Sequence, residues 1–302
     1  MSLKNVGEYL NRIVMPDKKQ TIIYLHGFGS SGQSGTVKHL RKKLPNYNVL
    51  APDIPVNPSE ALPFLKKFCE ENCPNLIIGT SMGAMYAMQM YNYMSLCVNP
   101  ALRMSELTDI LKPGTFKYFQ PTQAGDTHFT ITEDTIQQFR EMEAHMFDGV
   151  NQMNRAFCWG FFGDEDTTVN CREEFEEHFG PNVKTFQGGH RMNNHIIDEI
   201  ILPFVEDLLE CKNSRYKKGD WVKFISEEPS IYLSRYAYGY LIIEKEEHIG
   251  VIKDVQCVFM KWYLYTIETF PVEWLCFVDE KEIVEKLSDE QIETEKMKKM
   301  IL

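Results

Sequence analysis

The sequence has no long apolar run, and this absence argues against a protein that spans a membrane through helices. A membrane-spanning helix needs about 20 consecutive apolar residues, and no run in the 302 residues approaches that length. The first 20 residues also lack the basic-then-apolar layout of a secretion signal, because charged residues interrupt them at Lys4, Glu8, Arg12 and Asp17. We therefore expect a cytoplasmic protein with no membrane partner.

Basic charge is also scarce. The chain carries 32 lysines and arginines against 43 acidic residues, for a net charge of −11. Residues 213–302 alone hold 13 basic and 17 acidic residues, so both parts of the chain are acidic. Proteins that grip nucleic acid usually present a basic surface to the phosphates. We expect no nucleic-acid partner.

Metal and nucleotide motifs are missing as well. The eight cysteines do not make a disulfide framework in a chain of this length. Cys69 and Cys73 lie one helical turn apart, but no second cysteine or histidine pair stands at a zinc-like spacing. The glycine-rich segment 26–32 has neither the G-x-G-x-x-G spacing nor the Gly-Lys-Ser/Thr ending of phosphate-binding loops. We expect reduced thiols, no metal and no cofactor.

The most informative motif that is present is Gly79-Thr80-Ser81-Met82-Gly83. It follows an apolar run, Leu76–Ile78, and leads into a segment of small and apolar residues typical of a helix. In a strand–turn–helix with this pattern, the serine stands clear of its backbone on a strained turn. Glycine is needed on both sides because a Cβ at either position would clash where strand and helix cross. The pattern predicts Ser81 as a nucleophile.

A nucleophilic serine needs a general base, and the chain order Ser, acid, His is typical of α/β-hydrolases. The segment Gly188-Gly189-His190-Arg191 follows the last predicted strand, so His190 can reach back over Ser81 and is the expected base. His195 lies in the expected final helix and is interpreted as a packing or surface residue.

The acid is expected in the loop Gly163-Asp164-Glu165-Asp166, after the predicted strand 156–162. Asp166 stands three residues after Gly163 and three before Val169, a spacing at which a turn usually aims a carboxylate at the histidine. Asp166 is favoured, and Asp164 remains the alternative.

Oxyanion donors in such a site are backbone amides. One is expected from Met82, the residue after the nucleophile. The other is expected from the loop His26-Gly27-Phe28-Gly29, which follows the first predicted strand. Phe28 is the favoured donor and Gly27 the second choice. His26 is then interpreted as a residue that shapes this loop and not as a base.

Short apolar runs alternate with helical stretches through residue 210, which indicates a parallel sheet with helices on both faces. The expected strands are 21–25, 48–51, 76–79, 95–98, 156–162 and 183–186. The expected helices are 58–73, 82–94 and 196–210. The sequence therefore predicts an α/β fold with an α/β-hydrolase-type domain over residues 1–212.

The alternation fails between about residues 101 and 155, and we expect this insertion to form a lid. It follows the fourth predicted strand at its carboxyl end, so it should overhang Ser81. A helix is expected over 133–147. The aromatic residues that would suit an acyl or aryl group are Phe116, Tyr118, Phe119 and Phe129. Long insertions at such a position are often functional.

Residues 213–302 show a different pattern. Five short β-like segments are expected at about 220–226, 238–244, 248–254, 257–266 and 273–277. This spacing predicts a small SH3-like β-barrel. A charged amphipathic helix is expected over 279–299. No residue here is a catalytic candidate, and the barrel is expected to contact a protein partner or a second copy of the chain.

Four segments occur in the order and at spacings similar to those of a known family: Tyr24–Ser31, Ala51–Pro55, Gly79–Gly83 and Val98–Ala101. The chain resembles the YqiA/YcfP-like esterases of bacteria over roughly residues 20–210. The resemblance implies a small α/β-hydrolase that cleaves short acyl esters, with Ser81, His190 and the Phe28 and Met82 amides in the roles given above. The acid loop departs from the family after Gly163-Asp164-Glu165, and residues after 213 have no counterpart in it.

The leading hypothesis is a serine carboxylesterase that acts on a small-molecule ester through an acyl-enzyme. A thioesterase or a small-acyl transferase is the alternative within the same chemistry, because nothing in the sequence fixes the leaving group. A hypothesis of another class is a non-catalytic scaffold that binds a partner through the C-terminal barrel.

Overall fold

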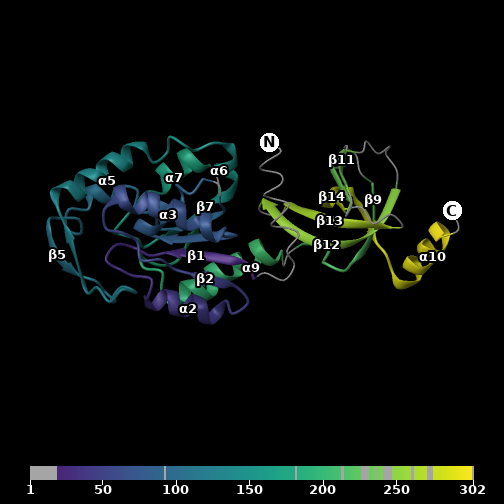
Figure 1. Cartoon of the computed structure of the whole chain (residues 1–302), viewed down its shortest axis with the longest axis horizontal. Helices are drawn as coiled ribbons and strands as arrows, with labels where there is room; N and C mark the ends of the chain where they lie inside the picture. Colours follow the sequence, from purple (N-terminus) through teal and green to yellow (C-terminus); the bar gives the residue numbers. More distant parts are fainter. Residues whose placement is uncertain are drawn as a thin grey trace. The chain divides into compact units, whose positions relative to one another are not determined.

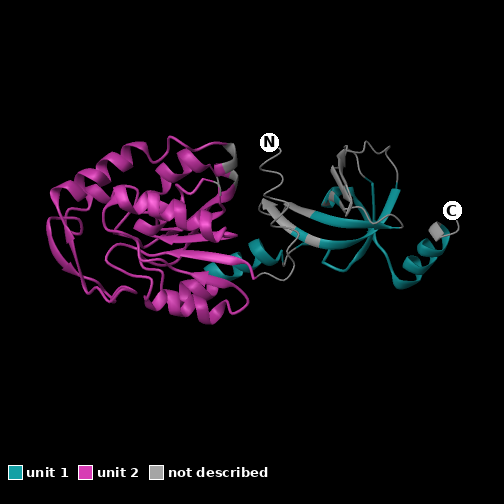
Figure 2. Cartoon of the chain, viewed as in Figure 1, with its two compact units in different colours: residues 1–16, 201–302 teal, residues 17–200 magenta. Residues whose placement is uncertain are grey.

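The computed structural model describes residues 19–91, 93–180, 182–211, 214–225, 231–234, 237–240, 247–259, 262–270 and 275–300. The chain divides into two compact units, which Figure 2 colours separately. Unit 2 is Asp17–Ile200, and unit 1 contains Ile201–Leu302. This division precedes residue 212, where the sequence pattern changes, and the predicted domain boundary there stays a prediction.

Unit 2 is built on a parallel sheet of six strands in the order β2-β1-β3-β4-β7-β8. The strands are β1 (Thr21–Leu25), β2 (Asn48–Leu50), β3 (Leu76–Thr80), β4 (Ser95–Val98), β7 (Cys158–Gly163) and β8 (Val183–Phe186). β1, β3 and β4 are buried along their whole length, as strands covered on both faces must be. All six predicted strands are present, but the strand predicted from residue 156 begins at Cys158, because residues 156 and 157 end helix α6.

The strand order explains why helices cover both faces. The connection from β1 to β2 runs toward one edge of the sheet, and the connections after β2 run toward the opposite edge. Because crossovers between parallel strands are right-handed, connections in opposite directions place their helices on opposite faces. Helix α2 (Gly35–Lys43) therefore lies on one side of the sheet, whereas α3 (Pro58–Asn72) and α7 (Arg172–Phe179) lie on the other (Figure 1). The α/β-hydrolase-like fold expected for this part of the chain is thus observed.

Two predicted helices differ in extent. α4 spans only Met82–Ala87, so the prediction of a helix to residue 94 was wrong. Every residue of α4 is buried, and a helix buried all round has no amphipathic pattern from which its end can be predicted. The predicted helix 196–210 is observed as three consecutive pieces: α8 (Asn194–Ile196), the π-helical turn η2 (Ile197–Ile201) and α9 (Leu202–Glu210).

The insertion between β4 and β7 contains a hairpin and helices. After the short helix η1 (Met104–Glu106), β5 (Gly114–Lys117) pairs antiparallel with β6 (His128–Ile131). Helices α5 (Glu133–His145) and α6 (Gln152–Phe157) follow. The helix predicted from residue 133 is confirmed, and a capping box between Thr132 and Thr135 fixes its start. The hairpin was not predicted.

Unit 1 contains an antiparallel sheet in the order β11-β10-β14-β13-β12-β9-β15. Its strands are β9 (Trp221–Ile225), β10 (Ile231–Ser234), β11 (Ala237–Tyr240), β12 (Glu247–Phe259), β13 (Trp262–Phe270), β14 (Leu275–Asp279) and β15 (Ile283–Lys286). Of the predicted segments, 257–266 was wrong as one strand, because β12 ends and β13 begins within it. Closure into an SH3-like barrel, and a protein partner or self-association through it, stay predictions.

The C-terminal helix begins later than the sequence predicted. The helix 279–299 was wrong in its first part, where the short helix η3 (Glu280–Glu282) and strand β15 lie, and α10 spans Asp289–Met300. Ile283 is 5% exposed and Val284 51% exposed. This alternation is the period of a strand with one buried face.

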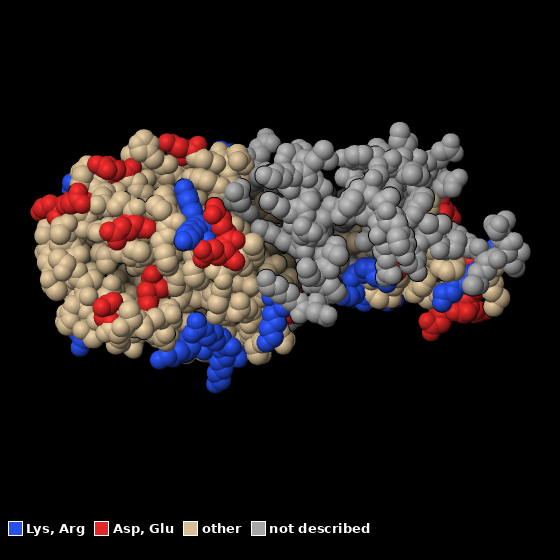
Figure 3. All heavy atoms as spheres, in the orientation of Figure 1, with Lys and Arg blue, Asp and Glu red and all other residues tan. Residues whose placement is uncertain are grey.

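Charge is spread unevenly over unit 2. The last turn of α2 carries Arg41, Lys42 and Lys43, where cations complement the carbonyl end of the helix. Figure 3 shows basic side chains gathered at one edge of this unit and acidic side chains scattered over the same face. Among the helices of the described residues, none combines the length and the apolar character needed to cross a bilayer.

Candidate active site

Ser81 stands on a strained turn between β3 and α4. Its backbone angles are φ 54° and ψ −121°, in a region that residues with a side chain rarely adopt. The Ser81 amide donates to the Val98 carbonyl at 3.0 Å, and the Ser81 carbonyl accepts from the Ala101 amide at 3.2 Å. These bonds tie the turn to the end of β4 and keep the serine at the carboxyl edge of the sheet.

Both glycines of the motif are required by close backbone contacts. A Cβ on Gly79 would lie within 3.0 Å of the Gly83 carbonyl oxygen and of Ala84. A Cβ on Gly83 would lie equally close to the Leu25 carbonyl of β1. An added Cβ would therefore clash at both glycines, as the sequence predicted. Each clash involves backbone atoms, which cannot shift without disturbing β1, β3 or α4.

Replacing Gly83 with alanine is expected to lower the free energy of unfolding by about 3 kcal/mol, because the added methyl overpacks β1 against α4. Gly35→Ala is the matched control, because a Cβ there meets nothing within 4 Å, and its effect is expected to stay within about 0.5 kcal/mol. Urea unfolding of the two variants measures the difference. Equal midpoints would contradict the close contact.

The structure brings Ser81, His190 and Asp166 into one hydrogen-bonded chain. Nε2 of His190 lies 2.9 Å from Oγ of Ser81, and Nδ1 lies 2.8 Å from Oδ2 of Asp166. A carboxylate only accepts hydrogen bonds, so Nδ1 carries the proton and Nε2 is left to accept from the serine hydroxyl. This is the tautomer that a general base needs.

Asp166 is fixed by its own loop. Its side chain is 4% exposed, and Oδ1 accepts from the amides of Thr168 at 2.8 Å and Val169 at 3.1 Å. Asp164 faces elsewhere, because its Oδ1 accepts from the Gly188 amide at 3.0 Å at an exposed position. The geometry therefore joins Asp166, and not Asp164, to His190.

The predicted oxyanion donors lie beside the serine. Met82 is the first residue of α4, where an N–H has no acceptor within the helix. Among the hydrogen bonds of the described residues, neither the Met82 nor the Phe28 amide donates to another group. A Cβ on Gly27 would be 3.4 Å from the Cβ of Ser81, so the loop that carries Phe28 runs directly past Ser81.

His26 shapes that loop, as the sequence predicted. Its Nδ1 donates to the Gly27 carbonyl at 3.0 Å, and its Nε2 accepts from the Ile54 amide at 3.1 Å. Burial lowers the pKa of His26, which favours the neutral ring that these two bonds require. His195 is exposed on α8, as expected for a surface residue.

Asn99 is a site residue that sequence reasoning missed. It is 1% exposed and has a left-handed backbone, with φ 45°. Its Nδ2 donates to the carbonyls of Gly189 and His190 at 3.1 and 3.0 Å, and its Oδ1 accepts from the Gly163 amide at 2.8 Å. The Asn99 carboxamide therefore holds both the loop that carries His190 and the start, at Gly163, of the loop that carries Asp166. An asparagine directly after a buried strand, where left-handed backbone is tolerated, was the available signal.

The insertion packs its aromatic side chains against the loop of Phe28. The rings of Phe28 and Phe129 lie edge to face with centroids 5.3 Å apart, and Tyr118 packs 4.7 Å from Phe129. Phe28, Met82, Tyr118 and Phe129 are among the residues that line a narrow hollow. Phe119 stays 69% exposed. Phe129 of the insertion therefore contacts the loop that carries Phe28, and the role of the insertion as a lid stays a prediction.

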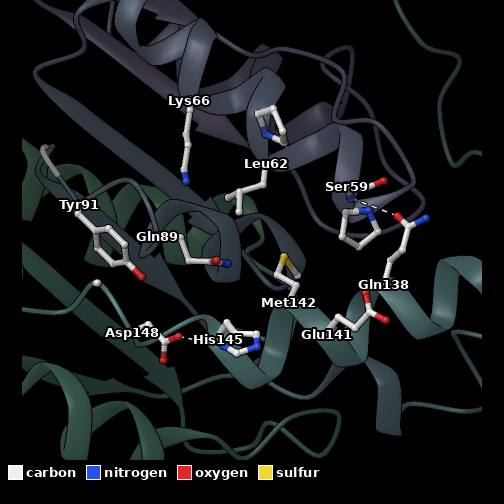
Figure 4. A pocket seen from close by; sticks show the side chains of 13 residues that line it. Ser59, Leu62, Lys66, Gln89, Tyr91, Gln138, Glu141, Met142, His145 and Asp148 are labelled. Atoms are coloured by element: carbon white, nitrogen blue, oxygen red, sulfur yellow. Dashed lines mark hydrogen bonds and ion pairs between the residues drawn. The ribbon is translucent and has the colours of Figure 1, made fainter.

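A larger hollow of about 510 Å³ lies between α3 and α5 (Figure 4). Leu62 and Met142 line it, and Gln138 accepts from the Ser59 amide at its rim. None of its lining residues belongs to the hydrogen-bonded chain of Ser81, His190 and Asp166 or to the loop of residues 26–32 that carries Phe28. The described residues contain no group of three or more His, Cys, Asp or Glu side chains placed to hold a metal ion.

The sequence model of a family described as "Uncharacterised protein family (UPF0227)" matches residues 21–201. Among solved structures, one described under the metagenome-derived lipolytic enzymes LipS and LipT is similar at 15% identity and a TM-score of 0.46, over 64% of this chain and 94% of that one. Est1E from Butyrivibrio proteoclasticus with ferulic acid bound is similar at 13% identity and 0.47, over 64% and 90%. Alpha/beta hydrolase domain-containing protein 10 from mouse is similar at 11% identity and 0.45, over 64% and 91%. At these identities and TM-scores, no activity is transferred from them.

Proposed function

Because the chain belongs to the UPF0227 family, which includes the YqiA/YcfP-like esterases, we propose that it is a serine hydrolase that cleaves short acyl carboxylesters. The observation that carries this proposal is the 2.9 Å separation of the Ser81 Oγ and the His190 Nε2. A hydroxyl on a strained turn, held at hydrogen-bond distance from an oriented imidazole, is the arrangement that makes serine nucleophilic.

The proposed reaction has two steps. Ser81 attacks the ester carbonyl while His190 takes its proton, and the Met82 and Phe28 amides stabilise the negative oxygen that forms. His190 then gives the proton to the departing alcohol, which leaves an acyl group on Ser81. Water, activated by the same imidazole, hydrolyses the acyl-enzyme. Asp166 stabilises the imidazolium in both steps and keeps its ring in place.

The narrowness of the hollow beside Met82 supports a short acyl group. Aromatic rings of Phe28, Tyr118 and Phe129 line it, and the packing of Phe28 and Tyr118 against Phe129, with ring centroids 5.3 and 4.7 Å away, leaves little free space. A long acyl chain would have to displace rings that are packed against the core of unit 2. An acetyl or propionyl group requires no such rearrangement.

The full-length protein, incubated with p-nitrophenyl acetate, is expected to release nitrophenol catalytically. A fluorophosphonate, which reacts only with activated serines, is expected to label it, and peptide mass spectrometry should place the label on Ser81. A protein that neither turns over the ester nor takes up the label would be a non-catalytic scaffold, and the proposal would fail. A label on a different serine would equally contradict it.

A further inference from the structure

Asp53 takes no part in the hydrogen bonds that link Ser81, His190 and Asp166. Its carboxylate instead joins the loop that carries Phe28 to the hairpin of the insertion. Oδ1 accepts from the amide of Gly32 at 2.7 Å, and Oδ2 accepts from the amide of Gln123 at 2.6 Å. Gly32 ends the oxyanion loop (residues 26–32), and Gln123 lies in the lid hairpin (residues 114–131), between β5 and β6. One half-buried side chain therefore connects two segments that are 91 positions apart in sequence.

Further hydrogen bonds join the same two segments. The Phe119 amide of the lid hairpin donates to the Gly29 carbonyl at 2.9 Å, and the Ser31 hydroxyl donates to the Pro121 carbonyl at 3.0 Å. Nε2 of Gln123 also donates to the Ala51 carbonyl at 2.8 Å, beside Asp53. Backbone from three regions of the chain is thus held together at one junction, where Asp53 is the one carboxylate among these bonds.

The junction also fixes the segment that carries the oxyanion donor. Ile54, the residue after Asp53, donates its amide to His26, which in turn donates to the Gly27 carbonyl. Residues 53 and 54 therefore hold the oxyanion loop near its beginning, at Gly27, and at its end, at Gly32. Phe28 lies between these two anchors, so the direction of its amide depends on both.

We propose that Asp53 is a positioning residue that couples docking of the lid hairpin to the geometry of the oxyanion loop. This inference rests on the proposed function, because it concerns the Phe28 amide as an oxyanion donor. Asp53 does not touch the substrate. Asp53 acts through the Phe28 amide, whose hydrogen bond to the substrate oxygen strengthens in the transition state. Loss of the Asp53 carboxylate therefore lowers kcat and leaves KM nearly unchanged.

The test is Asp53→Asn in the full chain. The carboxamide keeps the shape of the side chain, but its one oxygen can accept from only one of the two amides, and its NH₂ group faces the other N–H. The kcat for p-nitrophenyl acetate is expected to fall by about 10- to 100-fold, somewhat less than the loss of a whole oxyanion donor. KM should stay within about twofold, since ground-state binding is unchanged. The pH profile should keep its midpoint because His190 and Asp166 are untouched.

Asp126→Asn is the matched control, because Asp126 also lies in the lid hairpin but, among the bonds of the described residues, its carboxylate accepts only from the Thr122 hydroxyl within that hairpin. Its kcat is expected to equal that of the parent. Amide hydrogen exchange supplies a second readout: in Asp53→Asn, exchange should accelerate in peptides containing Gly32 and in those containing Gln123, and in Asp126→Asn it should not accelerate at Gly32.

The possible outcomes separate this inference from the proposed function. An unchanged kcat with a lowered melting temperature would show a purely structural role and overturn the inference, as would a raised KM at unchanged kcat. If the parent itself hydrolyses no ester, the proposed function fails, and the exchange experiment alone decides the coupling: acceleration confined to the lid hairpin overturns it. If Asp53→Asn does not fold, Gln123→Ala is the second variant, because it removes the side-chain bond to the Ala51 carbonyl at the same junction. Its kcat is expected to fall by a smaller factor than that of Asp53→Asn. An unchanged kcat in Gln123→Ala would overturn the coupling.

Discussion

Replacing Ser81 with alanine is expected to reduce the turnover of p-nitrophenyl acetate on the order of 10⁶-fold, the size of effect seen when a nucleophilic serine is removed from a hydrolase. The loss follows from the geometry, because Oγ is the atom that lies 2.9 Å from the His190 imidazole. Without it the imidazole has no hydroxyl to deprotonate and no acyl-enzyme forms. Steady-state assays over a range of substrate concentrations measure the change.

The variant is expected to fold like the parent, because alanine carries the same Cβ as serine on the φ 54° turn. Its circular-dichroism melting curve should therefore match that of the parent. Ser59→Ala serves as the control for serine replacement in general, since Ser59 is an exposed residue of α3, and its turnover should be unchanged. Full activity in Ser81→Ala would show that another residue performs the chemistry.

The parallel sheet was predictable because its strands are covered on both faces. A strand buried on both sides is apolar at most of its positions, so runs such as Ile22–Leu25 and Leu76–Ile78 can be recognised in the sequence. The lid hairpin gave no such signal. In β5 and β6 the burial alternates or is slight, and four-residue strands are too short for a period of two to be distinguished from chance.

The serine, aspartate and histidine could be proposed as site residues from the sequence because each follows a predicted strand, in a fixed order along the chain. Ser81 stands three positions after the apolar run Leu76–Ile78, His190 stands four positions after β8, and glycines mark both turns. Asn99 and Asp53 were not assigned roles, because their partners are backbone groups of distant loops. A hydrogen bond from an asparagine to a carbonyl 91 positions away leaves no local pattern in the sequence, so such a role can be recognised only when the fold is known.

The choice between Asp166 and Asp164 was open in the sequence for a related reason. The two residues stand in one loop, two positions apart, and only the path of that loop decides which carboxylate reaches the histidine. Backbone amides fix the path of the loop. Those of Thr168 and Val169 donate to the Asp166 carboxylate, whereas the Gly188 amide donates to the Asp164 carboxylate. Two single substitutions convert this difference into an activity measurement.

Asp166→Asn is expected to lower kcat/KM by about 10⁴-fold. The asparagine oxygen can still accept from the Thr168 and Val169 amides, so the loop keeps its shape. Its NH₂ group is then turned toward the Nδ1 of His190, which must give up its proton to accept from it. The proton moves to Nε2, and the imidazole faces Ser81 with an N–H in place of a lone pair. Steady-state assays of ester hydrolysis over a range of substrate concentrations measure the loss.

Asp164→Asn is the matched control two positions earlier in the same loop. A carboxamide there can still accept from the Gly188 amide, and no bond joins residue 164 to the His190 ring among those of the described residues. Its kcat/KM is expected to stay within about threefold of the parent, because removing an exposed charge has small effects. The rate of fluorophosphonate labelling should follow the same order, slow in Asp166→Asn and near the parent rate in Asp164→Asn. The reverse order would assign the acid to Asp164 and would require a loop path other than the one that places Oδ2 of Asp166 against His190.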